Sequence, residues 1–99
     1  MNFGVDGGFE ICRKPSGHGI FDKAFWGRVR ETAKHDALPE ACGCYVFTLK
    51  NGDNIKPWYV GKTEKGTFQS ESFKAHKIVY YNDILIEHNG TPLLFFCRA

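Results

Sequence analysis

Two short apolar runs, Gly43-Cys44-Tyr45-Val46-Phe47 and Trp58-Tyr59-Val60-Gly61, decide the fold of this chain. Both runs are rich in aromatic and β-branched residues, which is typical of strands. The stretch Asn51-Gly52-Asp53 between them is typical of a hairpin connection. Such a hairpin would bring the phenols of Tyr45 and Tyr59 to one edge of a small sheet, with Lys62 directly after the second strand.

Composition indicates one domain with a modest core. The chain has 99 residues, of which 42% are apolar and 15% aromatic. Thirteen basic and eleven acidic residues give a net charge of +2, which permits contact with a polyanion without requiring it. No stretch reaches the roughly 18 apolar residues of a membrane span, and the first residues do not resemble a signal peptide. We therefore expect a cytoplasmic protein with no membrane partner.

The cysteines do not form a recognisable metal or disulfide pattern. Cys12, Cys42, Cys44 and Cys97 are even in number, but without an export signal we expect reduced thiols. One residue separates Cys42 from Cys44, whereas structural zinc sites usually have about two to four between paired ligands. The four histidines supply no second close pair. We predict no zinc site and expect Cys42 and Cys44 to pack as small buried residues.

Periodicity predicts the remaining elements. Residues 1–20 are glycine-rich and indicate an irregular lead-in, and apolar residues at every fourth position from Phe21 to Ala33 predict a helix capped by Asp22. Strands are expected near 43–49 and 57–61, with a loop near 50–56. Two helices should follow, one from the Thr67 cap to about Ile78 and one over 79–88. A buried strand over 92–98 completes the order.

These elements predict an α+β domain with a small three-stranded mixed sheet flanked by helices. We expect one domain over 1–99, with an N-terminal extension and helix in 1–41 and the core in 42–99. The last strand ends one residue before Ala99, which leaves no sequence for a layer on the far side of the sheet. Another copy of the chain, or a protein partner, is therefore expected to complete the sheet as one alternative.

The two tyrosine motifs carry a family resemblance. Gly43-Cys44-Tyr45, followed at hairpin distance by Tyr59-Val60-Gly61, resembles the GIY-YIG nuclease domain, in which the second motif often reads Tyr-Val-Gly. The resemblance covers roughly residues 42–98, including the following helix and third strand. The segment from Lys62 to Lys77 is also similar to a bacterial branch of small family members. The resemblance implies a family domain truncated after its third strand.

The resemblance implies hydrolysis of DNA phosphodiester bonds with one divalent metal, Mg²⁺ or Mn²⁺. In that chemistry the attacking water loses a proton while cations offset charge on the phosphate oxygens. Tyr45 and Tyr59 match the family tyrosines, one as base or water-orienting group and the other as a hydrogen-bond bridge, in either order. A phenol with a free pKa of about 10 needs a nearby cation for such a role. Ordinary half-buried packing is the alternative interpretation of two strand tyrosines.

The resemblance assigns further residues. Lys62 would supply positive charge at the scissile phosphate, and His76 lies where related proteins often carry a histidine or tyrosine. The family arginine is expected about ten residues after the second-motif tyrosine, near Gln69 to Glu71, where this chain has none. Lys65, Lys74 or Lys77 is a candidate replacement, and with Lys62 these lysines are the candidate DNA contacts. Glu71 is a candidate altered ligand.

The family's metal-binding glutamate comes from a helix after the third strand, and this chain has no carboxylate at that position. Two interpretations of function therefore stay open. The first is an endonuclease of the GIY-YIG type seen as a shortened chain. The second is a catalytically impaired remnant that binds nucleic acid or a protein through the same face.

Overall fold

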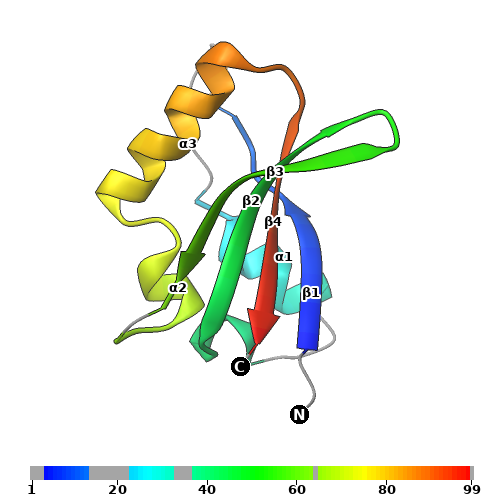
Figure 1. Ribbon diagram of the computed structural model, residues 1–99. Helices are drawn as coiled ribbons and strands as arrows, with labels where there is room; N and C mark the ends of the chain where they lie inside the picture. Colours follow the sequence, from blue (N-terminus) through cyan, green and yellow to red (C-terminus); the bar gives the residue numbers. More distant parts are fainter. Residues whose placement is uncertain (1–3, 14–22, 33–36, 64, 99) are drawn as a thin grey trace.

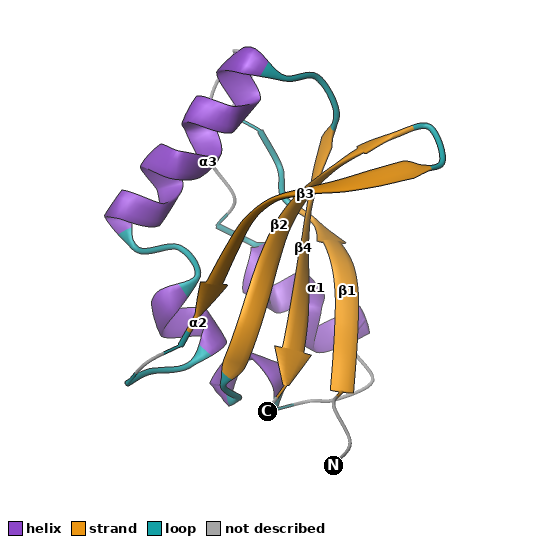
Figure 2. Cartoon of the chain, in the orientation of Figure 1, coloured by secondary structure: helices purple, strands orange, loops and turns teal. Residues whose placement is uncertain are grey.

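The computed structural model describes residues 4–13, 23–32, 37–63 and 65–98 (Figures 1 and 2). Within these ranges the strands are β1 (Gly4–Glu10), β2 (Gly43–Asn51), β3 (Asn54–Lys62) and β4 (Thr91–Arg98). The α-helices are α1 (Phe25–Thr32), α2 (Phe68–Glu71) and α3 (Ala75–Glu87), and a single 3-10 turn, η1, spans Leu38–Glu40. The α+β class expected from the sequence is confirmed.

The four strands form one sheet in the order β1-β4-β2-β3, and all neighbouring strands are antiparallel. The prediction of a three-stranded mixed sheet is therefore wrong in strand number and in direction. The extra strand is β1, which lies in the stretch expected to be an irregular lead-in. Its partner is β4, from Gly4 opposite Arg98 to Glu10 opposite Leu93.

The glycines of β1 explain why its sequence did not predict a strand. A Cβ at Gly7 or Gly8 would come within 2.8–3.0 Å of the Phe95 ring. Gly7 also has a φ of +137°, a conformation that side-chain-bearing residues rarely adopt. The register shifts between Asp6 and Phe9. β1 is thus held by pairing with β4 rather than by strand propensity.

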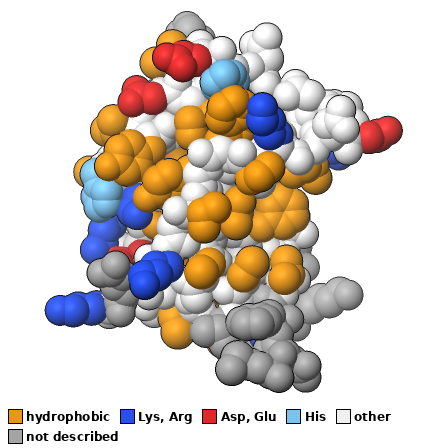
Figure 3. Space-filling view, in the orientation of Figure 1, with side chains coloured by type: hydrophobic (Ala, Val, Ile, Leu, Met, Phe, Trp, Pro, Cys, Tyr) orange, Lys and Arg blue, Asp and Glu red, His pale blue; other side chains and the backbone are white. Residues whose placement is uncertain are grey.

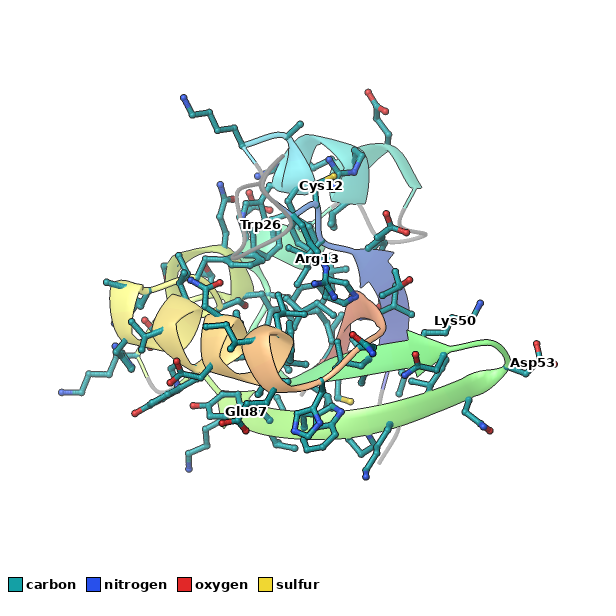
Figure 4. All side chains as sticks on the ribbon, turned by 90° about the horizontal axis from the view of Figure 1, so that it is seen from above. Cys12, Arg13, Trp26, Lys50, Asp53 and Glu87 are labelled. Atoms are coloured by element: carbon teal, nitrogen blue, oxygen red, sulfur yellow. The ribbon has the colours of Figure 1, made fainter. Side chains whose placement is uncertain are left out.

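The β2–β3 hairpin is longer and its turn is tighter than expected. Asn51 pairs with Asn54, so only Gly52 and Asp53 form the turn, and Gly52 has a φ of +59°. The predicted loop over 50–56 is wrong because Ile55 and Lys56 continue the ladder despite the polar composition around them. Figure 4 shows Lys50 and Asp53 at the end of this hairpin, which projects from the body of the molecule.

The helices follow the predicted order with different bounds. α1 begins at Phe25, whereas the predicted start Phe21, cap Asp22 and end Ala33 lie outside the described residues. Thr67 caps α2 as predicted, because its Oγ1 accepts a hydrogen bond from the Ser70 N–H at 3.2 Å. α2 is only one turn long, and the chain leaves the helical path before α3 begins at Ala75. The break between the two helices therefore lies between Glu71 and Ala75, earlier than the predicted boundary between 78 and 79.

The described helices all pack on one face of the sheet, which we call the inner face; it carries Tyr45, Phe47 and Phe96 (Figure 1). The Phe47 ring stacks on Tyr81 of α3 with a centroid separation of 4.4 Å. Phe68 of α2 lies 4.7 Å from Phe96 by the same measure. The core therefore lies between the inner face and the helices. None of the helices in the described ranges is long and apolar enough to cross a membrane.

The opposite face, the outer face, carries apolar residues that stay in contact with solvent. Figure 3 shows hydrophobic side chains across the strands on this side. Val5 is 65% exposed and Val60 63% exposed. Cys42 and Cys44 are also exposed, so the prediction that they are buried is wrong. The cause for Cys44 is alternation along β2, since Tyr45 points into the core and Cys44 therefore points away from it.

Candidate active site

The register of the hairpin brings the two motif tyrosines to the inner face. Tyr45 lies opposite Gly61, and Phe47 lies opposite Tyr59. Since residues directly opposite share a face, both tyrosines point toward α3. The Lys77 Nζ of α3 lies 5.6 Å from the centre of the Tyr45 ring and 5.1 Å from that of Tyr59. One ammonium group thus contacts both aromatic rings.

Gly61 makes room for Tyr45. A Cβ at this position would lie 2.4 Å from Cζ and 2.5 Å from the Oη of Tyr45. The phenol of one motif therefore lies directly against the glycine of the other. This contact gives the Tyr-Val-Gly triplet a packing role in addition to any chemical one.

Tyr59 and Lys77 form a direct polar contact. Lys77 Nζ donates a hydrogen bond to Tyr59 Oη at 2.7 Å. This bond, with a smaller contribution from Tyr45, raises the pKa of Lys77 above its ordinary value, and burial only partly opposes it. Lys77 is therefore a permanent cation at neutral pH and a stabilising neighbour for negative charge on the Tyr59 oxygen.

Tyr45 differs from Tyr59 in its surroundings. Its side chain is fully buried, and its hydroxyl has no hydrogen-bond partner among the described residues. Burial raises the pKa of Tyr45, an effect that the Lys77 ammonium only partly offsets. Tyr45 consequently remains a neutral phenol at physiological pH. Of the two tyrosines, Tyr59 has the environment that suits a water-orienting or proton-accepting group.

Tyr59 and Lys77 open onto a cavity of about 400 Å³ between the end of β3 and the start of α3. Its lining contains most of the residues singled out in the sequence, namely Tyr59, Lys62, Glu71, Lys74, His76 and Lys77, together with Val60 and Gly61. Figure 3 shows basic side chains gathered on the side of the molecule where α2 and the start of α3 lie. The structure thus assembles residues separated by up to 18 positions into one site.

Two of the predicted residues are placed differently. Tyr45 lies behind Gly61 and does not line the cavity. Lys65 is exposed in the connection between β3 and α2 and is also absent from the lining. Gln69, at the position expected for the family arginine, accepts a hydrogen bond from Arg30 at 3.2 Å. Lys74 and Lys77, rather than Lys65, therefore supply the cations near Tyr59.

The cavity lining suits an anion better than a divalent cation. It holds three lysines and one carboxylate, Glu71, whose Oε2 lies 2.6 Å from Lys74 Nζ. No group of three or more histidine, cysteine, aspartate or glutamate residues that could hold a metal ion occurs in the described parts of the chain. Mg²⁺ prefers several oxygen ligands, and a single carboxylate already paired with a lysine does not provide them. The described residues do not by themselves fit the metal implied by the resemblance.

The contact between Lys77 and Tyr59 is the main feature that sequence reasoning missed. Lys77 was expected only as a possible DNA contact or arginine replacement. Its spacing from Tyr81 and Leu85 was the available signal, because residues four apart share a helix face and the latter two are buried. A lysine in line with two buried residues indicates an ammonium held against the sheet.

Comparison with known proteins adds no assignment: no family model, curated protein or solved structure matches this chain.

Proposed function

We propose that the cavity beside Tyr59 is a phosphodiester site of the GIY-YIG endonuclease type, with DNA as its substrate class. The observation that carries this proposal is the Tyr59–Lys77 hydrogen bond in a cavity that also presents Lys62, Lys74 and His76. The motif resemblance of the two tyrosine triplets supports the same conclusion.

The charge distribution supports binding of a phosphate group. The lining holds three lysines and one glutamate, so the cavity has a positive potential, which lowers the free-energy cost of moving a phosphate out of water. Lys77 cannot swing away freely, because its Nζ is held by Tyr59 and lies over two rings. A pre-positioned cation of this kind stabilises charge on a phosphate oxygen without further reorganisation.

The same residues support a hydrolytic step. The oxygen of a water molecule forms a bond to phosphorus while the ester P–O bond breaks, and the leaving oxygen takes a proton from solvent. The Tyr59 hydroxyl, held by the hydrogen bond from Lys77, orients the attacking water, and the proton of the water passes to solvent. Lys62 and Lys74 offset the charge that develops on the non-bridging oxygens.

DNA binding tests the phosphate site. Duplex binding measured by fluorescence anisotropy should weaken as salt rises, and Lys62→Ala or Lys74→Ala should lower the slope of log Kd against log salt by about 0.9 for each lost contact. Lys50→Ala is the matched control, since Lys50 lies in the hairpin that projects away from the cavity (Figure 4). If Lys50→Ala has the same effect as Lys62→Ala, binding does not use the cavity.

Plasmid nicking tests the hydrolytic step. Supercoiled DNA incubated with Mg²⁺ or Mn²⁺ should be nicked, and Tyr59→Phe should abolish nicking while leaving Kd within about twofold. Salt-dependent binding without any nicking would instead support the second candidate, a nucleic-acid-binding module. The lone, paired carboxylate Glu71 favours that second candidate. Absence of both binding and nicking would overturn both.

A further inference from the structure

Four residues lie side by side across the sheet, one from each strand. Val5 of β1 lies opposite Cys97 of β4, Cys97 opposite Cys44 of β2, and Cys44 opposite Lys62 of β3. The two cysteines are therefore direct cross-strand neighbours although they are far apart in sequence. Neither belongs to the tyrosine site, and both carry free thiols.

The backbone pattern fixes the kind of pair that Cys44 and Cys97 form. The Thr63 N–H donates to the Gly43 carbonyl at 2.9 Å, so the backbone groups of Gly43 point toward β3. These groups alternate in direction along an antiparallel strand, and those of Cys44 therefore point toward β4. Cys44 and Cys97 are consequently a hydrogen-bonded pair, for which the Cα atoms lie about 5.5 Å apart.

This separation is compatible with a disulfide. Bridged cysteines have Cα atoms about 4.4–6.8 Å apart. Directly opposite residues have Cβ atoms about 4.5–5.5 Å apart, whereas a relaxed bridge needs about 3.5–4.5 Å. The strands must therefore twist slightly to close the bond. A bridge under such strain is readily reduced, which is the property of regulatory rather than structural disulfides.

Both thiols can be reached by a reagent. Cys44 is exposed and Cys97 partly exposed, and Val5 beside Cys97 is 65% exposed. The described helices all lie on the inner face, so none of them covers this pair (Figure 1). Access of this kind distinguishes an oxidisable pair from buried, inert cysteines.

We infer that Cys44 and Cys97 are a redox modification site that forms a reversible cross-strand disulfide when a small-molecule disulfide is present. The Cys44 thiolate attacks one sulfur of oxidised glutathione, forms a mixed disulfide and expels one glutathione thiolate. The Cys97 thiolate then attacks the Cys44 sulfur, forms the Cys44–Cys97 bond and expels the second glutathione. Two protein thiols are oxidised, one glutathione disulfide is reduced to two thiols, and the two protein protons pass to the released thiolates. This inference does not depend on the proposed function.

The test uses the Cys12→Ser/Cys42→Ser double variant, which removes the other two cysteines, both of them exposed. Incubation of the folded protein with oxidised glutathione should remove both remaining thiols from reaction with a maleimide and leave a monomer. Mass spectrometry should show tryptic peptides 35–50 and 78–98 joined, and dithiothreitol should separate them. The urea midpoint should rise on oxidation.

A third substitution provides the control. After treatment with oxidised glutathione and removal of the excess reagent, Cys97→Ser in the same background should keep a glutathione adduct on Cys44. Its urea midpoint should not rise. The inference is overturned if the double variant yields two glutathione adducts, a disulfide-linked dimer or unreacted thiols. It is also overturned if the bridge forms only in denaturing urea, because the folded register would then not be its cause.

Discussion

The two faces of this sheet carry similar residue types but have different roles. The inner face is covered by helices and holds the aromatic core and the Tyr59–Lys77 contact. The outer face also carries valine, phenylalanine and cysteine side chains, yet several of them are largely exposed. Composition alone therefore does not say which side of a strand is the core. What differs is the set of long-range partners that each face meets.

The largest expected effect compares neighbouring phenylalanines on opposite faces of β4. Phe96 is fully buried among Phe9, Trp26 and Phe68, and Phe96→Ala should lower the free energy of unfolding by about 3–5 kcal/mol. Phe95→Ala should cost only about 1 kcal/mol, since Phe95 lies on the outer face. Urea denaturation of the two variants measures the difference. Equal losses would mean that the outer face is as well packed as the inner one.

A smaller effect comes from adding a methyl group to the inner face. Gly61→Ala should destabilise the fold by about 1–3 kcal/mol, because the new Cβ would overlap the Tyr45 ring. Gly27→Ala in α1 is the matched control, since a Cβ there meets no atom within 4 Å. That variant should gain about 0.5–1 kcal/mol from helix propensity. A neutral Gly61→Ala in thermal or urea unfolding would contradict the packing of the two motifs.

The two tyrosines should respond in opposite directions to loss of the hydroxyl. Tyr59→Phe removes the hydrogen bond from Lys77 and should cost about 0.5–1.5 kcal/mol. Tyr45→Phe removes a buried hydroxyl without a partner among the described residues and should be neutral or stabilising by up to about 1 kcal/mol. Urea midpoints of both variants provide the measurement. Destabilisation by Tyr45→Phe would show that its hydroxyl is satisfied in solution.

The two buried tyrosines and Lys77 should make stability depend on pH in alkali. Burial raises the pKa of both Tyr45 and Tyr81, and the Tyr59 contact raises that of Lys77. The folded protein therefore keeps protons that the unfolded chain begins to lose near pH 10, so stability falls as pH rises beyond about 10. Urea midpoints between about pH 8 and 11 should decline less steeply for Tyr45→Phe. An unchanged decline in that variant would exclude Tyr45 as a contributor.

The hairpin and the Thr67 cap could be predicted from the sequence because their determinants are local. Residues typical of strands flank Asn51-Gly52-Asp53 in the hairpin. The Thr67 side chain accepts its capping hydrogen bond from Ser70, only three residues away. β1 could not be predicted in the same way. Its partner strand begins about eighty residues later, and its glycines serve the packing of Phe95 rather than any local preference.

The candidate site was predictable as a set of residues but not as a set of contacts. The motifs identified Tyr59 and Lys62, and the helical segment supplied His76 and Lys77. Which lysine meets Tyr59 depends on how α3 crosses the inner face, and that is set by packing such as Tyr81 against Phe47. Tyr45 is separated from the cavity by its own packing against Gly61. The difference between a buried and a cavity-lining tyrosine is therefore a tertiary property.

The central position of β4 has a consequence for the order in which the fold can form. β4 joins β1 to the β2–β3 hairpin, yet it is the last of the four strands to be synthesised. The hairpin can form early because its contacts are close in sequence, whereas β1 has no strand partner until residues 91–98 leave the ribosome. Completion of the sheet is therefore a late step, with a high contact order, that waits for the C-terminal strand.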